Sequence, residues 1–171
     1  MWSKLHKNIV MTPTYAKRSP VVLYNHVALL FLLPVFLQSC TSDKKIYKSD
    51  CDINITFKKI GFTQLIDSIK SYDQQYVEVS GTYKEAKEQS ALFNDSLFVD
   101  HSNKHALWIN FSPDCPLYLK GTRTGLFEAT DGEFTPINNK KVLIRGRIDL
   151  HNTGFQGLYK GTIDRVSSVE L

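Results

Sequence analysis

Three segments of this chain carry apolar side chains at every second position, in residues 77–83, 107–111 and 142–150. Successive side chains of a β-strand point to opposite faces of a sheet, so this period predicts strands with one buried and one exposed face. A further strand is predicted between residues 157 and 171. The pattern therefore indicates a domain that is mostly β-sheet.

Two of these strands share a glycine that follows the alternating apolar pair. The segments are Tyr76-Val-Glu-Val-Ser-Gly81 and Lys141-Val-Leu-Ile-Arg-Gly146. Glycine inside a strand often marks a bulge or a sharp bend, which allows a small sheet to curl and close. The pair predicts a small barrel, with chance similarity between two β-rich segments as the alternative.

One segment changes to the helical period. Apolar residues recur at helical spacing from Phe62 to Tyr72, which predicts an amphipathic helix with Thr63 as its N-cap. Alternation in residues 53–57 predicts a short strand before this helix. Further short strands are expected at residues 91–93 and 97–99, which are separated by a turn-forming Asn-Asp pair.

The first 39 residues have a different organisation. A basic region with four Lys or Arg residues and no acidic residue precedes an apolar run of ten residues, from Ala28 to Leu37. This is the layout of a secretory signal, and a run of this length spans about 15 Å as a helix, half the thickness of a bilayer core. An uncleaved membrane helix that begins at Val21 is the alternative, although it would contain Pro34. Met11 is an alternative start of the chain.

The end of this leader, Leu37-Gln-Ser-Cys40, resembles the lipobox of bacterial lipoproteins, with Gln38 a less usual residue at its position. The resemblance implies cleavage between Ser39 and Cys40, a diacylglycerol on the Cys40 thiol and acylation of the new amino terminus. Several acyl chains anchor a protein stably at a membrane surface. Thr41 stands where an aspartate keeps enterobacterial lipoproteins at the inner membrane, so the resemblance favours the outer membrane.

The sequence is thus divided into a lipoprotein signal peptide (residues 1–39), a flexible tether (residues 40–52) and a folded domain (residues 53–171). The tether is predicted because residues 41–52 are polar and charged without apolar periodicity. The expected location is the cell envelope of a Gram-negative bacterium, lipid-anchored at the outer membrane and facing the periplasm or the cell surface.

From Phe62 to Leu171 the chain resembles the small OB-fold-like envelope domains of bacterial lipoproteins, whose function is uncharacterised. The resemblance rests on the helix that leads into the strand at Tyr76, on Ala106-Leu-Trp-Ile-Asn-Phe, on Val142-Leu-Ile-Arg-Gly and on the closing Gly154-Phe-Gln-Gly-Leu-Tyr-Lys-Gly. It implies a five-stranded barrel preceded by an amphipathic helix, and no activity. Residues 112–139 depart from the pattern, because an OB-fold often places a helix there and this segment is predicted to be a long loop rich in Gly and Pro.

The net charge of +4 comes entirely from the leader. The remaining residues hold 17 basic and 17 acidic side chains, so the domain is formally neutral and lacks the positive surface from which nucleic-acid binding draws its affinity. Nucleic acid is therefore not an expected partner. With Cys40 acylated, Cys51 and Cys115 remain as an even pair, either bridged by a disulfide or left as two thiols.

No catalytic motif or cofactor site is apparent. His101 and His105 are four residues apart, but a turn that enters a strand does not place these positions on one face, so neither is predicted to bind a metal. The sequence has no nucleophile elbow, no phosphate-binding loop and no context that would activate Cys51 or Cys115. The chain is accordingly predicted not to be an enzyme, with an envelope hydrolase as the remote alternative.

Aromatic residues provide the candidate ligand-binding site. OB-folds bind ligands on one face of the barrel and its flanking loops, commonly through aromatic side chains. Tyr76, Trp108, Phe155 and Tyr159 are the candidates, with burial in the core as the alternative for each. We expect a non-catalytic binding module for an envelope protein, peptide or glycan. The second hypothesis is a structural or assembly lipoprotein with only a protein–protein interface.

Overall fold

The computed structural model describes residues 44–128 and 134–171, so the predicted leader and Cys40 lie outside the described residues. None of the helices in these two ranges is long and apolar enough to span a membrane. The elements in chain order are β1 (Ile46–Lys48), β2 (Lys58–Lys59), α2 (Phe62–Asp67), the 3-10 helix η2 (Ile69–Tyr72), β3 (Tyr76–Ala86), β4 (Gln89–Phe93), the 3-10 helix η3 (Asn103–His105), β5 (Leu107–Ile109), β6 (Tyr118–Leu119), β7 (Lys141–Asp149), the 3-10 helix η4 (Phe155–Gly157) and β8 (Gly161–Glu170).

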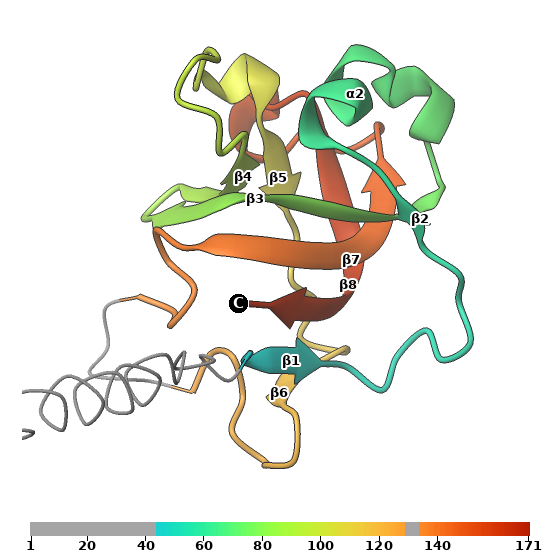
Figure 1. Ribbon diagram of the computed structural model, residues 1–171, viewed down its shortest axis with the longest axis vertical. Helices are drawn as coiled ribbons and strands as arrows, with labels where there is room; N and C mark the ends of the chain where they lie inside the picture. Colours follow the sequence, from blue (N-terminus) through green and yellow to red (C-terminus); the bar gives the residue numbers. More distant parts are fainter. Residues whose placement is uncertain (1–43, 129–133) are drawn as a thin grey trace, which may run out of the picture. The chain divides into compact units, whose positions relative to one another are not determined.

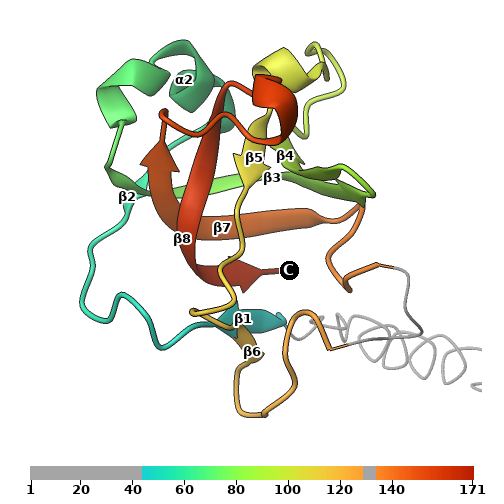
Figure 2. The same cartoon turned by 180° about the vertical axis from the view of Figure 1, so that it is seen from behind.

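Five strands close a barrel in the order β3-β4-β5-β8-β7, and β7 returns to pair with β3. All neighbours are antiparallel except β5 and β8, which run parallel from Leu107–Gly161 to Ile109–Ile163. Figures 1 and 2 show this barrel from opposite sides, with β7 in orange and β8 in red. The fold is therefore mostly β and is a small OB-fold-like barrel, which confirms the prediction.

The interior of the barrel is apolar because the alternating residues of each strand point inward, as the period of two predicted. The inward side chains that are fully buried include those of Val77, Val79, Leu107, Ile144, Ile148, Ile163 and Val169. Leu126 and Ile137, from the long segment between β5 and β7, complete the core.

The two glycines of the repeated strand pattern lie where the backbone of a neighbouring strand approaches closely. A β-carbon at Gly81 would come within 2.5 Å of the Phe93 carbonyl oxygen, and one at Gly146 within 2.7 Å of the Asp164 carbonyl oxygen. The register between β7 and β8 shifts between Arg145 and Arg147, which is the bulge expected around Gly146. Both glycines thus allow the sheet to bend into a barrel.

The predicted helix covers one end of the barrel as α2 followed by η2. All five residues of its predicted apolar face are buried, namely Phe62, Leu65, Ile66, Ile69 and Tyr72. The predicted N-cap was wrong. Gly61 occupies that position, with its carbonyl accepting from the Leu65 N–H, and the Thr63 hydroxyl accepts instead from the Asn94 side chain. The helix begins two residues earlier than that cap implied, which places Phe62 in its buried first turn.

Part of the predicted tether belongs to the folded domain. Ile46–Lys48 form β1, which pairs with the end of β8 and with β6, and Tyr47 is buried. The expectation of a flexible segment was wrong for these residues, because three residues are too few to reveal a period and their main stabilisation comes from a distant strand. Residues 41–43 lie outside the described residues.

Two predicted short strands are also corrected. Ile53 is 72% exposed in a turn, and only Lys58–Lys59, beyond the predicted segment, pair with β3. In the predicted strand at residues 97–99, Leu97 and Phe98 are 90% and 97% exposed. Here the Asn94 side chain accepts from the Ser96 N–H and turns the chain away from the sheet. Alternation over three residues does not form a strand without a partner edge.

The long segment between β5 and β7 is predominantly loop, as predicted, and its described residues contain no helix. Its start is fixed by a disulfide between Cys51 and Cys115, whose Cα atoms are 5.7 Å apart. The bridge ties the chain after β1 to the chain after β5. It thereby holds one wall of the cavity described next.

Candidate functional site

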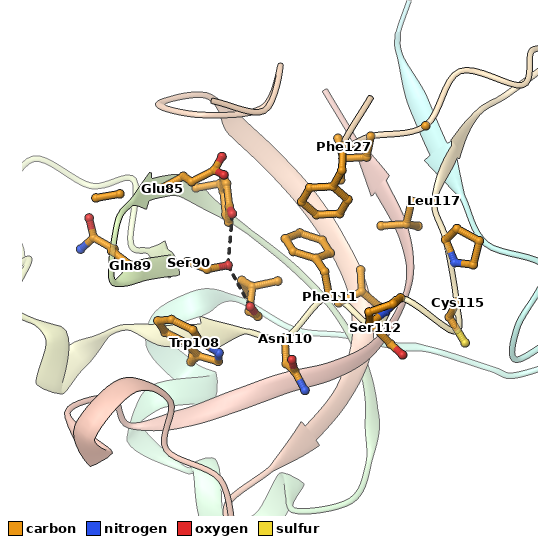
Figure 3. Close-up of a pocket in the computed structure, with 18 of the residues that line it drawn as sticks. Glu85, Gln89, Ser90, Trp108, Asn110, Phe111, Ser112, Cys115, Leu117 and Phe127 are labelled. Atoms are coloured by element: carbon orange, nitrogen blue, oxygen red, sulfur yellow. Dashed lines mark hydrogen bonds between the residues drawn. The ribbon is translucent and has the colours of Figure 1, made fainter. Parts of the chain in front are cut away.

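A groove of about 820 Å³ opens between the β3–β4 hairpin, the end of β5 and the loop that follows β5. The volume lies within the range of ligand pockets in proteins. Figure 3 shows Glu85, Gln89 and Ser90 on one side, Trp108 and Asn110 along one edge, and Phe111 and Phe127 on the other side. The groove therefore combines segments that are far apart in the sequence but adjacent in the barrel.

Aromatic side chains form much of the groove surface. Phe111 packs edge to face on Phe127, with ring centroids 5.0 Å apart, and lies 5.9 Å from the ring of the buried Tyr83. Trp108 and Phe155 extend the aromatic surface, and both are half-buried. Phe127 is 55% exposed although it is a large apolar residue. Such a surface gives an incoming apolar or planar group an extensive contact area.

A polar network lies beneath this aromatic surface. The Tyr83 hydroxyl and the Ser90 hydroxyl are 3.1 Å apart, and Ser90 donates to the Ile109 carbonyl oxygen at 2.9 Å. Burial raises the pKa of Tyr83 to about 12, so its phenol remains neutral at physiological pH. Burial likewise raises the pKa of Tyr159, which packs behind Trp108. Neither phenol contributes a charge to the groove.

Carboxylates dominate the charge of the groove. Among the described residues, those that line it with a charge are Glu85, Glu88, Glu128 and Lys87, which sum to a formal net charge of −2. Glu85 is fixed in place, because its Oε2 accepts from both the backbone N–H and the hydroxyl of Thr135, at 3.0 and 2.7 Å. Glu88, Glu128 and Lys87 are exposed at the rim. This charge disfavours phosphate and other anionic ligands.

The four predicted ligand-binding aromatics separate into three locations. Trp108 and Phe155 line the groove. Tyr159 is buried beside Trp108, with ring centroids 5.2 Å apart, and so supports the groove from behind. Tyr76 lies elsewhere on the barrel and stacks edge to face on Phe57 at 5.8 Å. The expectation that Tyr76 and Tyr159 are available to a ligand in this site is not met.

Sequence reasoning missed two central residues of the groove, Phe111 and Phe127. Phe111 was assigned to the buried side of a strand, whereas β5 ends at Ile109 and Phe111 turns into the groove. Phe127 lies in the predicted loop, where no periodicity identifies a face. The signal available for Phe127 was an isolated aromatic residue in a polar, glycine-rich segment.

Among the described residues, the histidines do not form a hydrolytic active site. His105 Nδ1 lies 3.0 Å from Asp100 Oδ2, but the Ser102 hydroxyl donates to the same carboxylate at 2.9 Å. A Ser-His-Asp triad requires the serine on the opposite ring nitrogen from the aspartate, and here both groups lie at Nδ1. The backbone N–H of Ser102 also donates to Asp100. The arrangement stabilises an exposed turn.

A second group, Asp73, Asp149 and His151, brings ligand atoms within 4.8 Å of one another. The carboxylates already have structural roles: Asp73 accepts from the Leu150 N–H, and Asp149 accepts from the His151 N–H. These bonds close the turn after β7 and account for the cluster. His101, which was also predicted not to bind a metal, is exposed.

The chain was compared with protein-family models, with curated proteins and with solved structures. These comparisons found no match.

Proposed function

We propose that this protein is a lipid-anchored, non-catalytic binding module of the bacterial cell envelope, which holds a protein, peptide or glycan partner in the groove. One observation carries the proposal. The groove is lined by the second and third strands of the barrel, β4 and β5, by the β3–β4 hairpin and by Phe155 from the β7–β8 loop. OB-folds bind their ligands at this face and at these two loops.

The anchor is supported by the sequence pattern that ends at Cys40. A basic region, a short apolar run and Leu37-Gln-Ser-Cys40 together favour export and acylation, with placement at the outer membrane. Replacing Cys40 with alanine is expected to abolish acylation and to release the protein from the membrane fraction. Retention of the variant in membranes with its fatty chains intact would refute the anchor.

The non-catalytic assignment is supported by the lining of the groove. Among the described residues that line it, none is a histidine, and the Cys115 sulfur is held in a disulfide. The Ser90 hydroxyl donates to the Ile109 carbonyl oxygen, and no histidine or carboxylate in the described part of the chain bonds to it. Nucleophilic catalysis by a serine or cysteine needs a base within hydrogen-bond distance of the nucleophile.

A second candidate is an assembly protein with only a protein–protein interface. It is favoured by Leu97 and Phe98, which are almost fully exposed next to each other in the β4–β5 loop. Exposed apolar groups at a loop tip are typical of contact sites for another protein. This site lies outside the groove, so the two candidates are separable by mutation.

The experiment compares Phe127→Ala with Phe98→Ala in the full, membrane-anchored chain. Both side chains are exposed, so neither change should unfold the barrel. The protein is cross-linked in intact cells and recovered, and the co-purifying proteins and sugars are identified by mass spectrometry. Loss of the partner with Phe127→Ala alone supports groove binding. Loss with Phe98→Ala alone supports the assembly candidate and refutes the first proposal.

A further inference from the structure

Three features of the groove narrow the chemical class of its ligand: its charge, its aromatic surface and the end of the β4–β5 ladder. We infer that the groove binds an extended peptide segment in which Lys or Arg residues alternate with apolar residues. This inference rests on the proposed function, because it names the chemistry of the partner that the groove would hold. Three separate observations lead to it.

The first observation is an incomplete ladder at the groove. β4 pairs with β5 only at Ala91–Trp108 and Leu92–Leu107. Its first two residues, Gln89 and Ser90, pair with β3 alone, and a side-chain bond from Ser90 to Ile109 replaces the ladder there. Both residues line the groove. The groove therefore opens where the ladder ends, and the side-chain amides of Gln89 and Asn110 that line it there can bond the backbone of an extended peptide.

The second observation is the sign of the charge. The carboxylates of Glu88 and Glu128 lie at the exposed rim, and that of Glu85 is fixed by Thr135. Both Thr135 bonds use Oε2 of Glu85, so among the described residues Oε1 remains an available acceptor. Lys87 is the single cation among the described lining residues. A cationic ligand is therefore attracted, and an anionic peptide or acidic glycan is repelled.

The third observation is that apolar and acidic side chains line the groove together. Phe111, Phe127 and Trp108 provide the apolar contact, whereas the carboxylates come from the β3–β4 hairpin and from Glu128 at the rim. Side chains of an extended peptide point alternately to two sides. Apolar side chains can thus contact the aromatic rings while the cationic residues between them reach the carboxylates.

The test uses the full chain purified in detergent and measures binding by fluorescence polarisation. The probes are a labelled peptide in which Lys alternates with Leu, the same peptide with Glu in place of Lys, and a labelled neutral chito-oligosaccharide. The variants are the double change Glu88→Gln with Glu128→Gln, and Trp108→Ala. The matched control neutralises two exposed carboxylates outside the groove, Asp50→Asn with Asp67→Asn.

We expect the Lys peptide to bind. Its affinity should fall about tenfold in the groove double variant and change less than about twofold in the control. An equal loss of affinity for the Lys peptide in the groove variant and the control would overturn the inference, because the attraction would then be non-specific. Stronger binding of the Glu peptide or the oligosaccharide, lost in Trp108→Ala, would also overturn it but would leave groove binding intact. Failure of every probe overturns the inference, and the cross-linking of Phe127→Ala then decides the proposed function separately.

Discussion

Gly154 lies directly against Trp108: a β-carbon at this glycine would come within 2.6 Å of the indole Cγ. The glycine has a φ of +69° and a ψ of −159°, a conformation that other residues rarely adopt. The loop between β7 and β8 can therefore pass over the indole only because this position has no side chain. The orientation of Trp108 in the groove depends on it.

Gly154→Ala is expected to displace Trp108 and to lower the free energy of unfolding by about 2–4 kcal/mol, through backbone strain and the clash together. The matched control is Gly121→Ala, which also has a positive φ, +81°, but whose β-carbon would have no described neighbour within 4 Å. This control variant should lower the free energy of unfolding by only about 1 kcal/mol. Urea unfolding gives both values, and tryptophan fluorescence of the mature chain, residues 40–171, reports on Trp108 alone. An unchanged emission spectrum in Gly154→Ala would contradict the prediction.

Gly146→Ala tests the bend of β7. The new methyl group would meet Ile163 Cγ2 at 2.5 Å and the Asp164 carbonyl oxygen at 2.7 Å, and the backbone atom cannot move without breaking the β7–β8 ladder. We expect a loss of about 2–4 kcal/mol in urea unfolding. Gly61→Ala is the control, because nothing lies within 4 Å and its φ of −71° suits alanine. Similar stability of the two variants would show that β7 does not need the glycine.

The disulfide between Cys51 and Cys115 links residues 64 positions apart. A cross-link over a loop of this length restricts the unfolded chain, so the double Cys→Ser variant should lose about 3–4 kcal/mol. Denaturant unfolding with and without reductant measures the effect, and the double variant should not respond to reductant. If reductant leaves the stability of the unmodified protein unchanged, although free thiols appear, the bridge contributes nothing to the fold.

Tyr83 should make the stability of the protein depend on pH in the alkaline range. Its pKa is raised by burial to about 12, against about 10 in the unfolded chain. The unfolded state ionises first as the pH rises, so the stabilisation is complete below pH 10 and is lost between pH 10 and pH 12, by about 2 kcal/mol. Unfolding free energies measured across this range should fall more steeply for the unmodified protein than for Tyr83→Phe. Parallel curves would refute the assignment.

Periodicity in the sequence was enough to predict most of the barrel. The period of two located β3, β5 and β7, the helical period located α2 and η2, and the repeated glycine indicated closure at Gly81 and Gly146. These features are local, because each strand has a buried face whose residues lie within a few positions of one another. A local sequence pattern is therefore sufficient to predict an element that buries one of its own faces.

The failures occurred where stability comes from distant partners. β1 is held by β8 and β6, more than 60 residues away, so its three residues carry no pattern of their own. The groove could be predicted only in part for the same reason. Trp108 lies on a patterned strand, whereas Phe127 is placed by a loop whose position depends on contacts with Leu117 and Phe111.

The pairing of β1 with β8 sets a working distance for the protein. With Cys40 acylated, only the five residues from Thr41 to Lys45 separate the lipid from the sheet, and a fully extended chain of that length spans about 18 Å. Under the proposed anchoring, a tether this short would confine the barrel to the zone next to the lipid headgroups. If the proposed anchor and binding function hold, a partner would have to come to the bilayer surface to be bound.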